Sequence, residues 1–393
     1  MTIVRLALLP VVLFLSSCIA FTSQTMTFRY DQRADRLHIF QIYQGIHGKD
    51  AGAGLTVEER KELESVIKGE RTFFFANWIT EFSRAGIEKS VKELEAKKEK
   101  TKNEKLNLAR MKMVLANVKV RNGRFYLDAR NRLSGYQYVT VSHFSKLLEA
   151  ANRAISQSVK NVKADKKILG FDLGKKTRAR LKKAAAGDFA WIKMKGNRLI
   201  LTMPMTYPDY LKVRMEMAAT LRKRLEKKNA TVDSIRKVLN PYVGLIENDA
   251  QISYENNAFT VKVGHPKSRY TPVYMRLAGN YKPNAAAYVA QRCRKTNTRR
   301  IAALIEQLGH DDHKQREAAA AELRSESAWA HALLENAKNH ENPVIRARVR
   351  SILQAVNSRG QTKGAQAAPP AVVMKRMQAF LLAGRVPDQG KSC

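Results

Sequence analysis

Acidic residues are scarce in this 393-residue chain. Its 35 Asp and Glu stand against 71 Lys and Arg, which leaves a formal net charge of +36 at pH 7. Such an excess favours anionic partners, namely phospholipid headgroups, acidic envelope polymers or nucleic acid. The hydrophobic fraction of 44% is typical of a globular protein and argues against a disordered chain. The length suits two domains or one large domain.

Cysteine is also rare, with only Cys18, Cys293 and Cys393 in the chain. Their spacing lacks the paired close ligands of a structural zinc site. Familiar catalytic motifs are missing: there is no H-E-x-x-H, no G-x-S-x-G, no P-loop, and no dinucleotide-binding glycine pattern after a strand. The sequence therefore predicts no cofactor and no recognisable catalytic residue. A catalytic site dispersed over several loops is the alternative.

One dense group of metal-type side chains is present, His310-Asp311-Asp312-His313. It lies where a turn leads into a predicted helix, and acids at that position ordinarily accept the first backbone N–H groups of the helix. We therefore expect a capping role and no metal. A divalent-metal site is the alternative.

No apolar run is long enough to cross a bilayer, which takes about 20 residues. The N-terminal run from Leu6 to Leu15 follows one positive charge, Arg5, and leads into Leu15-Ser16-Ser17-Cys18. A charge, an apolar run and then small residues are the order of a secretory signal. The last four residues resemble the lipobox of bacterial lipoproteins, in which the cysteine becomes the lipid-bearing first residue of the mature chain.

The lipobox resemblance implies that residues 1–17 are removed and that lipid on Cys18 holds the protein to a membrane. Ile19 replaces the Asp that often marks inner-membrane retention, which favours the outer membrane. An ordinary secreted protein is the alternative. An exported protein does not meet chromosomal DNA, so we do not expect nucleic acid as its natural partner. If Cys18 carries lipid, Cys293 and Cys393 are left as an even pair, and they are either a disulfide or two free thiols.

The body begins with strand-like patterns. Residues 26–30 and 37–43 alternate apolar and polar side chains, and the aromatic-rich residues 71–78 predict a buried strand. Thr56 to Glu59 is a capping box that opens a short helix. Residues 87–113 predict a long helix, whose charged part is either a solvated segment or a turn between two helices.

Three later segments share one pattern of strand, two-residue turn and strand. Their predicted turns are Asn122-Gly123, Gly196-Asn197 and Asn256-Asn257. Such turns favour tight hairpins. Helices follow the first two hairpins, and we expect Ser142 and Thr206 to cap them. The sequence thus predicts an α+β fold of antiparallel β-hairpins covered by helices on one side. The other sheet face would need cover, a ligand or a partner.

Residues 300–356 are rich in Ala and Leu and read as helices throughout. Two units match at a spacing of thirty residues, Asp312–Arg316 and Asn342–Arg346. The segment from Leu304 to Leu323 resembles a HEAT-type helical repeat. The resemblance implies a small all-α unit docked on the body, in which the acidic turn and its arginine are structural. HEAT repeats stack into solenoids that bind other proteins.

These patterns divide the chain into five parts: a signal peptide at 1–17, a lipidated tether at 18–25, an α+β body at 26–290, a HEAT-like unit at 291–357, and a linker, short helix and tail at 358–393. The short helix is expected from Val372 to Leu382.

Basic residues gather in clusters along the chain. The candidate anion-binding residues are Lys166, Lys167, Lys175, Lys176, Arg178, Arg180, Arg292, Arg294 and Lys295. A general basic bias that keeps the surface soluble is the alternative. We expect a non-enzymatic envelope lipoprotein that binds or scaffolds an anionic or protein partner. An envelope hydrolase with a dispersed active site is the alternative function.

Overall fold

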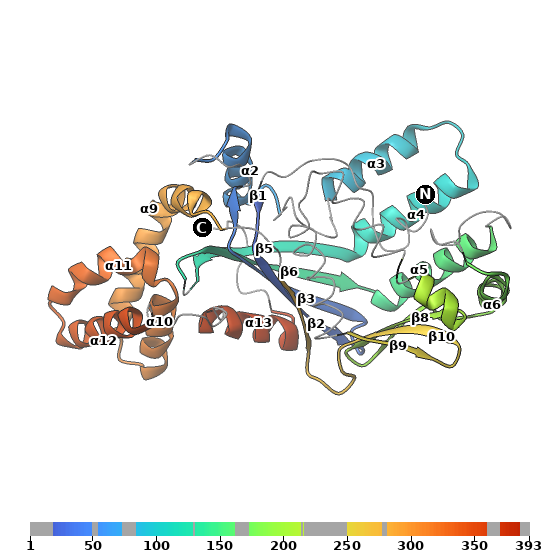
Figure 1. Cartoon of the computed structure of the whole chain (residues 1–393). Helices are drawn as coiled ribbons and strands as arrows, with labels where there is room; N and C mark the ends of the chain where they lie inside the picture. Colours follow the sequence, from blue (N-terminus) through green and yellow to red (C-terminus); the bar gives the residue numbers. More distant parts are fainter. Residues whose placement is uncertain are drawn as a thin grey trace.

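A computed structural model describes residues 19–48, 54–72, 84–128, 130–161, 173–213, 215, 250–276, 281–359 and 370–385. These residues form antiparallel sheets covered by helices, with a group of helices at one end of the molecule (Figure 1). The α+β fold class predicted from the sequence is confirmed. The strand predicted at residues 71–78 falls largely on residues outside these ranges.

Five antiparallel strands form the main sheet, in the order β11-β2-β3-β6-β5. Their bounds are β2 (Ser23–Asp31), β3 (Arg36–Gln44), β5 (Val118–Leu127), β6 (Leu133–Ser142) and β11 (Thr271–Arg276). The strands expected at 26–30 and 37–43 are β2 and β3. A small ladder of β1 (Ile19–Ala20) and β4 (His47–Gly48) extends from this hairpin.

The hairpin predicted at Asn122-Gly123 is wrong. Both residues lie inside the continuous strand β5, where the pairing with β6 is interrupted by a bulge. The side chain of Asn122 donates to the carbonyl of Arg71 and accepts from Gln137, so it serves the core and not a turn. Gly123 is needed because the ring of Tyr136 occupies the place that a Cβ atom would take. The chain turns instead after Asp128.

The other two predicted hairpins are confirmed, and they build a second sheet in the order β7-β8-β10-β9. Its strands are β7 (Ile192–Lys195), β8 (Arg198–Pro204), β9 (Ala250–Glu255) and β10 (Ala258–Val263). Asn256 and Asn257 both have positive φ, 51° and 56°, as a tight hairpin requires. Gly196 has a φ of 57° and lies against the carbonyl of Pro266, where any side chain would clash.

Asn197 joins the second sheet to the main sheet. Its Oδ1 accepts the backbone N–H of Tyr30 in β2 at 2.7 Å. Its Nδ2 donates to the carbonyls of Ser268 and Arg269, at 2.5 and 3.0 Å, in the segment that leads into β11. The side chain is only 7% exposed, so water cannot replace these bonds at low cost. A residue predicted to form a turn therefore also holds the two sheets together.

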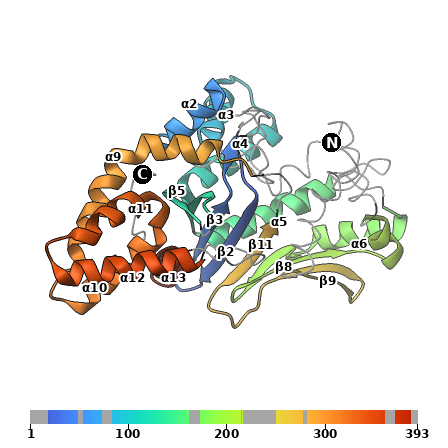
Figure 2. The same ribbon diagram turned by 60° about the vertical axis from the view of Figure 1, so that its left-hand side comes forward.

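Two helices, α5 (Phe144–Lys160) and α6 (Lys175–Ala186), cover one face of the second sheet (Figure 2). The core between them contains Trp191, which is 2% exposed and whose indole N–H donates to Ser156. The predicted cap of α5 is wrong. Its N-cap residue is His143, and the helix N–H of Ser145 is accepted by Asp35 from the β2–β3 turn.

The structure describes three further helices before β5. They are α2 (Val57–Ile67), α3 (Arg84–Ala96) and α4 (Lys102–Asn117). The capping box of Thr56 and Glu59 is formed as predicted. The long helix is divided into α3 and α4 by a turn, so the turn alternative for its charged part is correct. A second capping box, Thr101 with Glu104, starts α4 and explains the break.

One face of the main sheet is covered by the C-terminal helix α13 (Ala371–Ala383), close to the predicted range. Phe380 is fully buried there against Phe40 and Tyr138. Arg29 of β2 donates to the carbonyls of Leu381 and Leu382, which closes the C-terminal end of the helix. The cover expected for this face is thus part of the chain itself.

The end group of helices contains α9 (Asn284–Gln307), α10 (His313–Ser325), α11 (Ser327–Asn336), the 3₁₀ turn η1 (Ala337–Asn339) and α12 (Pro343–Arg359). The 24-residue α9 crosses the predicted boundary at 290/291 and packs on α2 as well as on α10 and α11. One continuous helix therefore joins the body to this unit.

Candidate functional site: the outer surface of helix α6

Helix α6 has a narrow apolar side and a wide basic side. Thr177, Leu181 and Ala185 recur every four residues and are at most 1% exposed, so they face the core. The four lysines of the helix are exposed: Lys175, Lys176, Lys182 and Lys183. None of them forms an ion pair with any residue that the structure describes.

The position of two of these lysines works against the helix itself. Lys175 and Lys176 occupy the first turn, where the helix macrodipole is positive and where no acid is present. Cations at that end destabilise a helix by about 0.3–1 kcal/mol each. Lys183, in the last turn, has the favourable position. An anion bound at the N-terminal end would offset the first-turn repulsion.

Asp209, an acid beside the start of α6, is fixed by hydrogen bonds from neighbouring residues. Asp209 accepts the N–H of Gly174 at 3.1 Å and the hydroxyl of Thr206 at 3.0 Å. Burial raises the pKa of Asp209, but hydrogen bonds from Thr177, Gly174 and Thr206 outweigh that effect and the net pKa is lowered. Asp209 is therefore an ionised group that fixes the start of the helix and does not pair with the lysines.

The two arginines of α6 have structural partners. Arg178 donates from Nε to the carbonyl of Leu173 at 2.6 Å, and Arg180 donates to the carbonyl of Met205 at 3.2 Å. Both were predicted as anion-binding residues. Their guanidinium groups hold the helix on its neighbours, although each keeps further N–H donors. The lysines are the stronger candidates.

The second predicted basic cluster lies elsewhere. Arg292 of α9 forms a close ion pair with Glu64 of α2, at 2.5 Å, and lowers the pKa of that carboxyl. This pair fastens α9 to α2, so Arg292 serves the fold. Arg294 is exposed on α9, at the opposite end of the molecule from α6 (Figures 1 and 2). Lys166, Lys167 and the side chain of Lys295 lie outside the described residues.

The repeated turns of the helical unit share one hydrogen-bond pattern. In each, a histidine accepts the N–H two residues later, through Nδ1 of His310 and of His340. In each, an arginine donates to two turn carbonyls: Arg316 bonds those of His310 and Asp311, and Arg346 those of His340 and Glu341. The thirty-residue spacing found in the sequence is therefore a real structural repeat.

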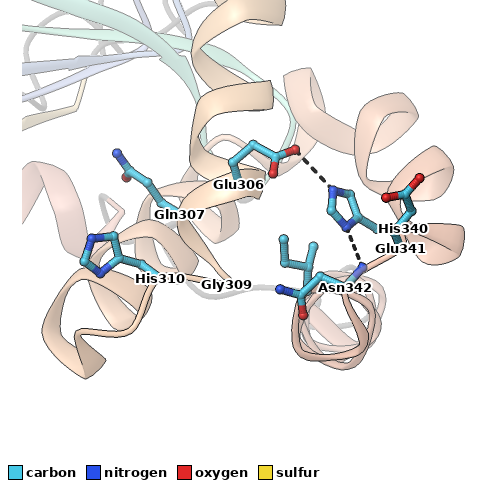
Figure 3. A pocket seen from close by; sticks show the side chains of 8 residues that line it. Glu306, Gln307, Gly309, His310, His340, Glu341 and Asn342 are labelled. Atoms are coloured by element: carbon cyan, nitrogen blue, oxygen red, sulfur yellow. Dashed lines mark hydrogen bonds and ion pairs between the residues drawn. The ribbon is translucent and has the colours of Figure 1, made fainter.

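An open pocket of about 480 Å³ lies between these two turns (Figure 3). Glu306 projects from the end of α9 toward His340, and their side chains are 3.1 Å apart. Asp312 accepts the N–H of Lys314 and caps α10, which is the role predicted from its position. Within the described ranges, no group of three or more His, Cys, Asp or Glu is arranged to hold a metal ion.

Cys293 of α9 is 1% exposed and is disulfide-bonded. The chain has two other cysteines, Cys18 and Cys393, and both predicted roles fall outside the described residues. Ile19, next to Cys18 in sequence, packs in the same core as Cys293.

Among the helices that the structure describes, none has both the length and the apolar character needed to cross a membrane. The chain matches no protein-family model, no curated protein and no solved structure.

Proposed function

We propose that this chain is a lipid-anchored envelope protein that binds an anionic partner through the outer surface of α6, without catalysis. The observation that carries the proposal is the group of four exposed lysines on α6 that form no ion pair with a described residue, two of them placed where the helix dipole disfavours cations. The chain's net charge of +36 supports the same class of partner.

The binding test uses labelled polyphosphate as the anionic probe and the full chain in neutral detergent, at ~0.15 M salt where the Debye length is about 8 Å. In the test variant, Lys175, Lys176, Lys182 and Lys183 are replaced by Gln. At about 1 kcal/mol for each lysine near an anionic surface, affinity should fall about 1000-fold.

The matched control removes the same charge from exposed lysines on other helices and the turn beside them: Lys61, Lys92, Lys98 and Lys105. This variant should lose much less affinity, because long-range effects of net charge are screened at this salt. Equal losses in the two variants would refute α6 as the binding surface and leave only the general basic bias.

The anchor is a separate part of the proposal, supported by Leu15-Ser16-Ser17-Cys18. Intact mass of the envelope fraction should show an acylated chain starting at Cys18, and a Cys18→Ser variant should lose both the acyl mass and membrane fractionation. If the native chain has no acyl mass, the anchor is refuted while the binding test stands.

The disulfide of Cys293 adds an independent check. A lipidated Cys18 leaves Cys393 as the one remaining cysteine, which would close a loop of about 100 residues, worth roughly 4.7 kcal/mol in the chain-entropy description. Peptide mapping without reduction should recover Cys293 linked to Cys393. A peptide linking Cys18 to Cys293 would contradict both the bridge and the lipid anchor.

A further inference from the structure

The main sheet carries a second group of exposed cations, on the face that α13 also covers. Arg36 of β3 and Lys119 and Arg121 of β5 are exposed, and none forms an ion pair with a described residue. Between these strands runs β6, whose Thr140 is half-buried.

The strand register places these side chains together. Thr140 is directly opposite Lys119 on one side and His38 on the other. Arg36 precedes His38 by two residues and Arg121 follows Lys119 by two, so all five point to one face of the sheet. Neighbouring strands are about 4.8 Å apart, which long cationic side chains span easily.

Helix α13 brings a fourth cation to this part of the sheet. The ring of Phe380 contacts that of His38, with centroids 5.2 Å apart, and Gly384 lies against the same ring. Arg385 follows directly, is exposed, and has no ion pair within the described ranges.

Two acids lie near these cations, and one of them, Asp31, is directly opposite Arg36 in the pairing of β2 with β3. Asp31 accepts the N–H groups of Arg33 and Ala34, and Asp35 accepts the N–H and hydroxyl of Ser145. The four cations around Thr140 outnumber these two acids, so this surface keeps an excess of positive charge and of hydrogen-bond donors.

We propose that Arg36, Lys119, Arg121 and Arg385 form a binding site for a phosphate group, with the hydroxyl of Thr140 as a further donor. The three guanidinium groups and one ammonium group come from β3, β5 and the residues after α13. They suit a tetrahedral anion, which offers more acceptor oxygens than a carboxylate. None of these residues belongs to α6, so the site is additional to the proposed function. A lipid headgroup and a soluble phosphate monoester present the same chemistry.

The experiment reads each lysine separately by mass spectrometry after brief acetylation of the full chain in neutral detergent. Two probes are compared, glycerol phosphate in solution and mixed micelles containing phosphatidic acid. Lys119 should be protected, whereas Lys92, an exposed lysine of α3, should react at an unchanged rate. Protection by both probes assigns the site to any phosphate monoester, and protection only in the micelles assigns it to the headgroup.

The decisive variant is Arg36→Gln, because Arg36 lies on β3 and Lys119 on β5, with β6 between them. The probe concentration that protects Lys119 should rise about tenfold, as expected for the loss of one charge-assisted hydrogen bond. The control Arg350→Gln, an exposed arginine of α12, should leave it unchanged. Unprotected Lys119 with both probes, or equal effects of the two variants, would overturn the proposal, and neither result depends on the lysines of α6.

Discussion

Replacing Asn197 by Ala should loosen the connection between the two sheets. The substitution removes three hydrogen bonds, from the N–H of Tyr30 and to the carbonyls of Ser268 and Arg269. Each contributes about 1 kcal/mol net, so the free energy of unfolding should fall by about 3 kcal/mol. The residue is 7% exposed, which limits compensation by water.

Urea denaturation followed by tryptophan fluorescence measures this change, since Trp191 lies in the core of the second sheet. The control is Asn161→Ala, because Asn161 is exposed and its side chain accepts one hydrogen bond from Gln157. In native-state hydrogen exchange, the amide of Tyr30 should exchange faster only in the Asn197 variant. A stability loss no larger than that of the control, with the amide of Tyr30 still protected from exchange, would refute the role of Asn197 in joining the two sheets.

Three further predictions concern buried groups. Phe380→Ala should lower the free energy of unfolding by about 3–5 kcal/mol in thermal denaturation, whereas Leu382→Ala, at a residue 42% exposed, should lower it by under about 1 kcal/mol. Equal losses would contradict the packing of α13 on the main sheet. Burial lowers the pKa of His38 from 6.5 to about 4, so the unfolded chain holds that proton more tightly and stability should fall as pH drops from about 6.5 toward 4. This loss of stability should reach at most about 3 kcal/mol and should be absent in His38→Gln. The same pH dependence in the variant would contradict the assignment of the loss to His38. Arg300→Met should lower the free energy of unfolding in urea by about 3–5 kcal/mol, because it removes the cation 2.8 Å from the buried carboxylate of Glu326. Burial raises the pKa of Glu326, and a near-neutral effect of the substitution would show that this group is protonated.

Local signals in the sequence were reliable where the residues that carry them interact only with near neighbours. The capping box at Thr56, the turn at Asn256-Asn257 and the repeat of Asp312 and Asn342 all satisfy backbone groups within a few residues. The turn predicted at Asn122-Gly123 failed because both residues are taken by distant partners, Arg71, Gln137 and Tyr136. Tertiary contacts of that kind leave no periodic trace in the sequence.

The candidate sites show the same division. Lysines of one helix are adjacent in sequence, so the basic surface of α6 was visible before the fold. Arg36, Lys119 and Arg385 come from three distant segments, and only the pairing of β3, β5 and β6 brings them together. Arg292 was predicted as an anion-binding residue, and the sequence did not show that it would pair with Glu64 on another helix.

The salt dependence of polyphosphate binding tests the central claim most directly. For a flexible polyanion, the slope of log affinity against log salt changes by about 0.7 for each phosphate contact. Replacing Lys175, Lys176, Lys182 and Lys183 should therefore reduce the slope by about 3, while the control at Lys61, Lys92, Lys98 and Lys105 leaves it nearly unchanged. Equal slopes in the two variants would contradict a localised binding surface on α6.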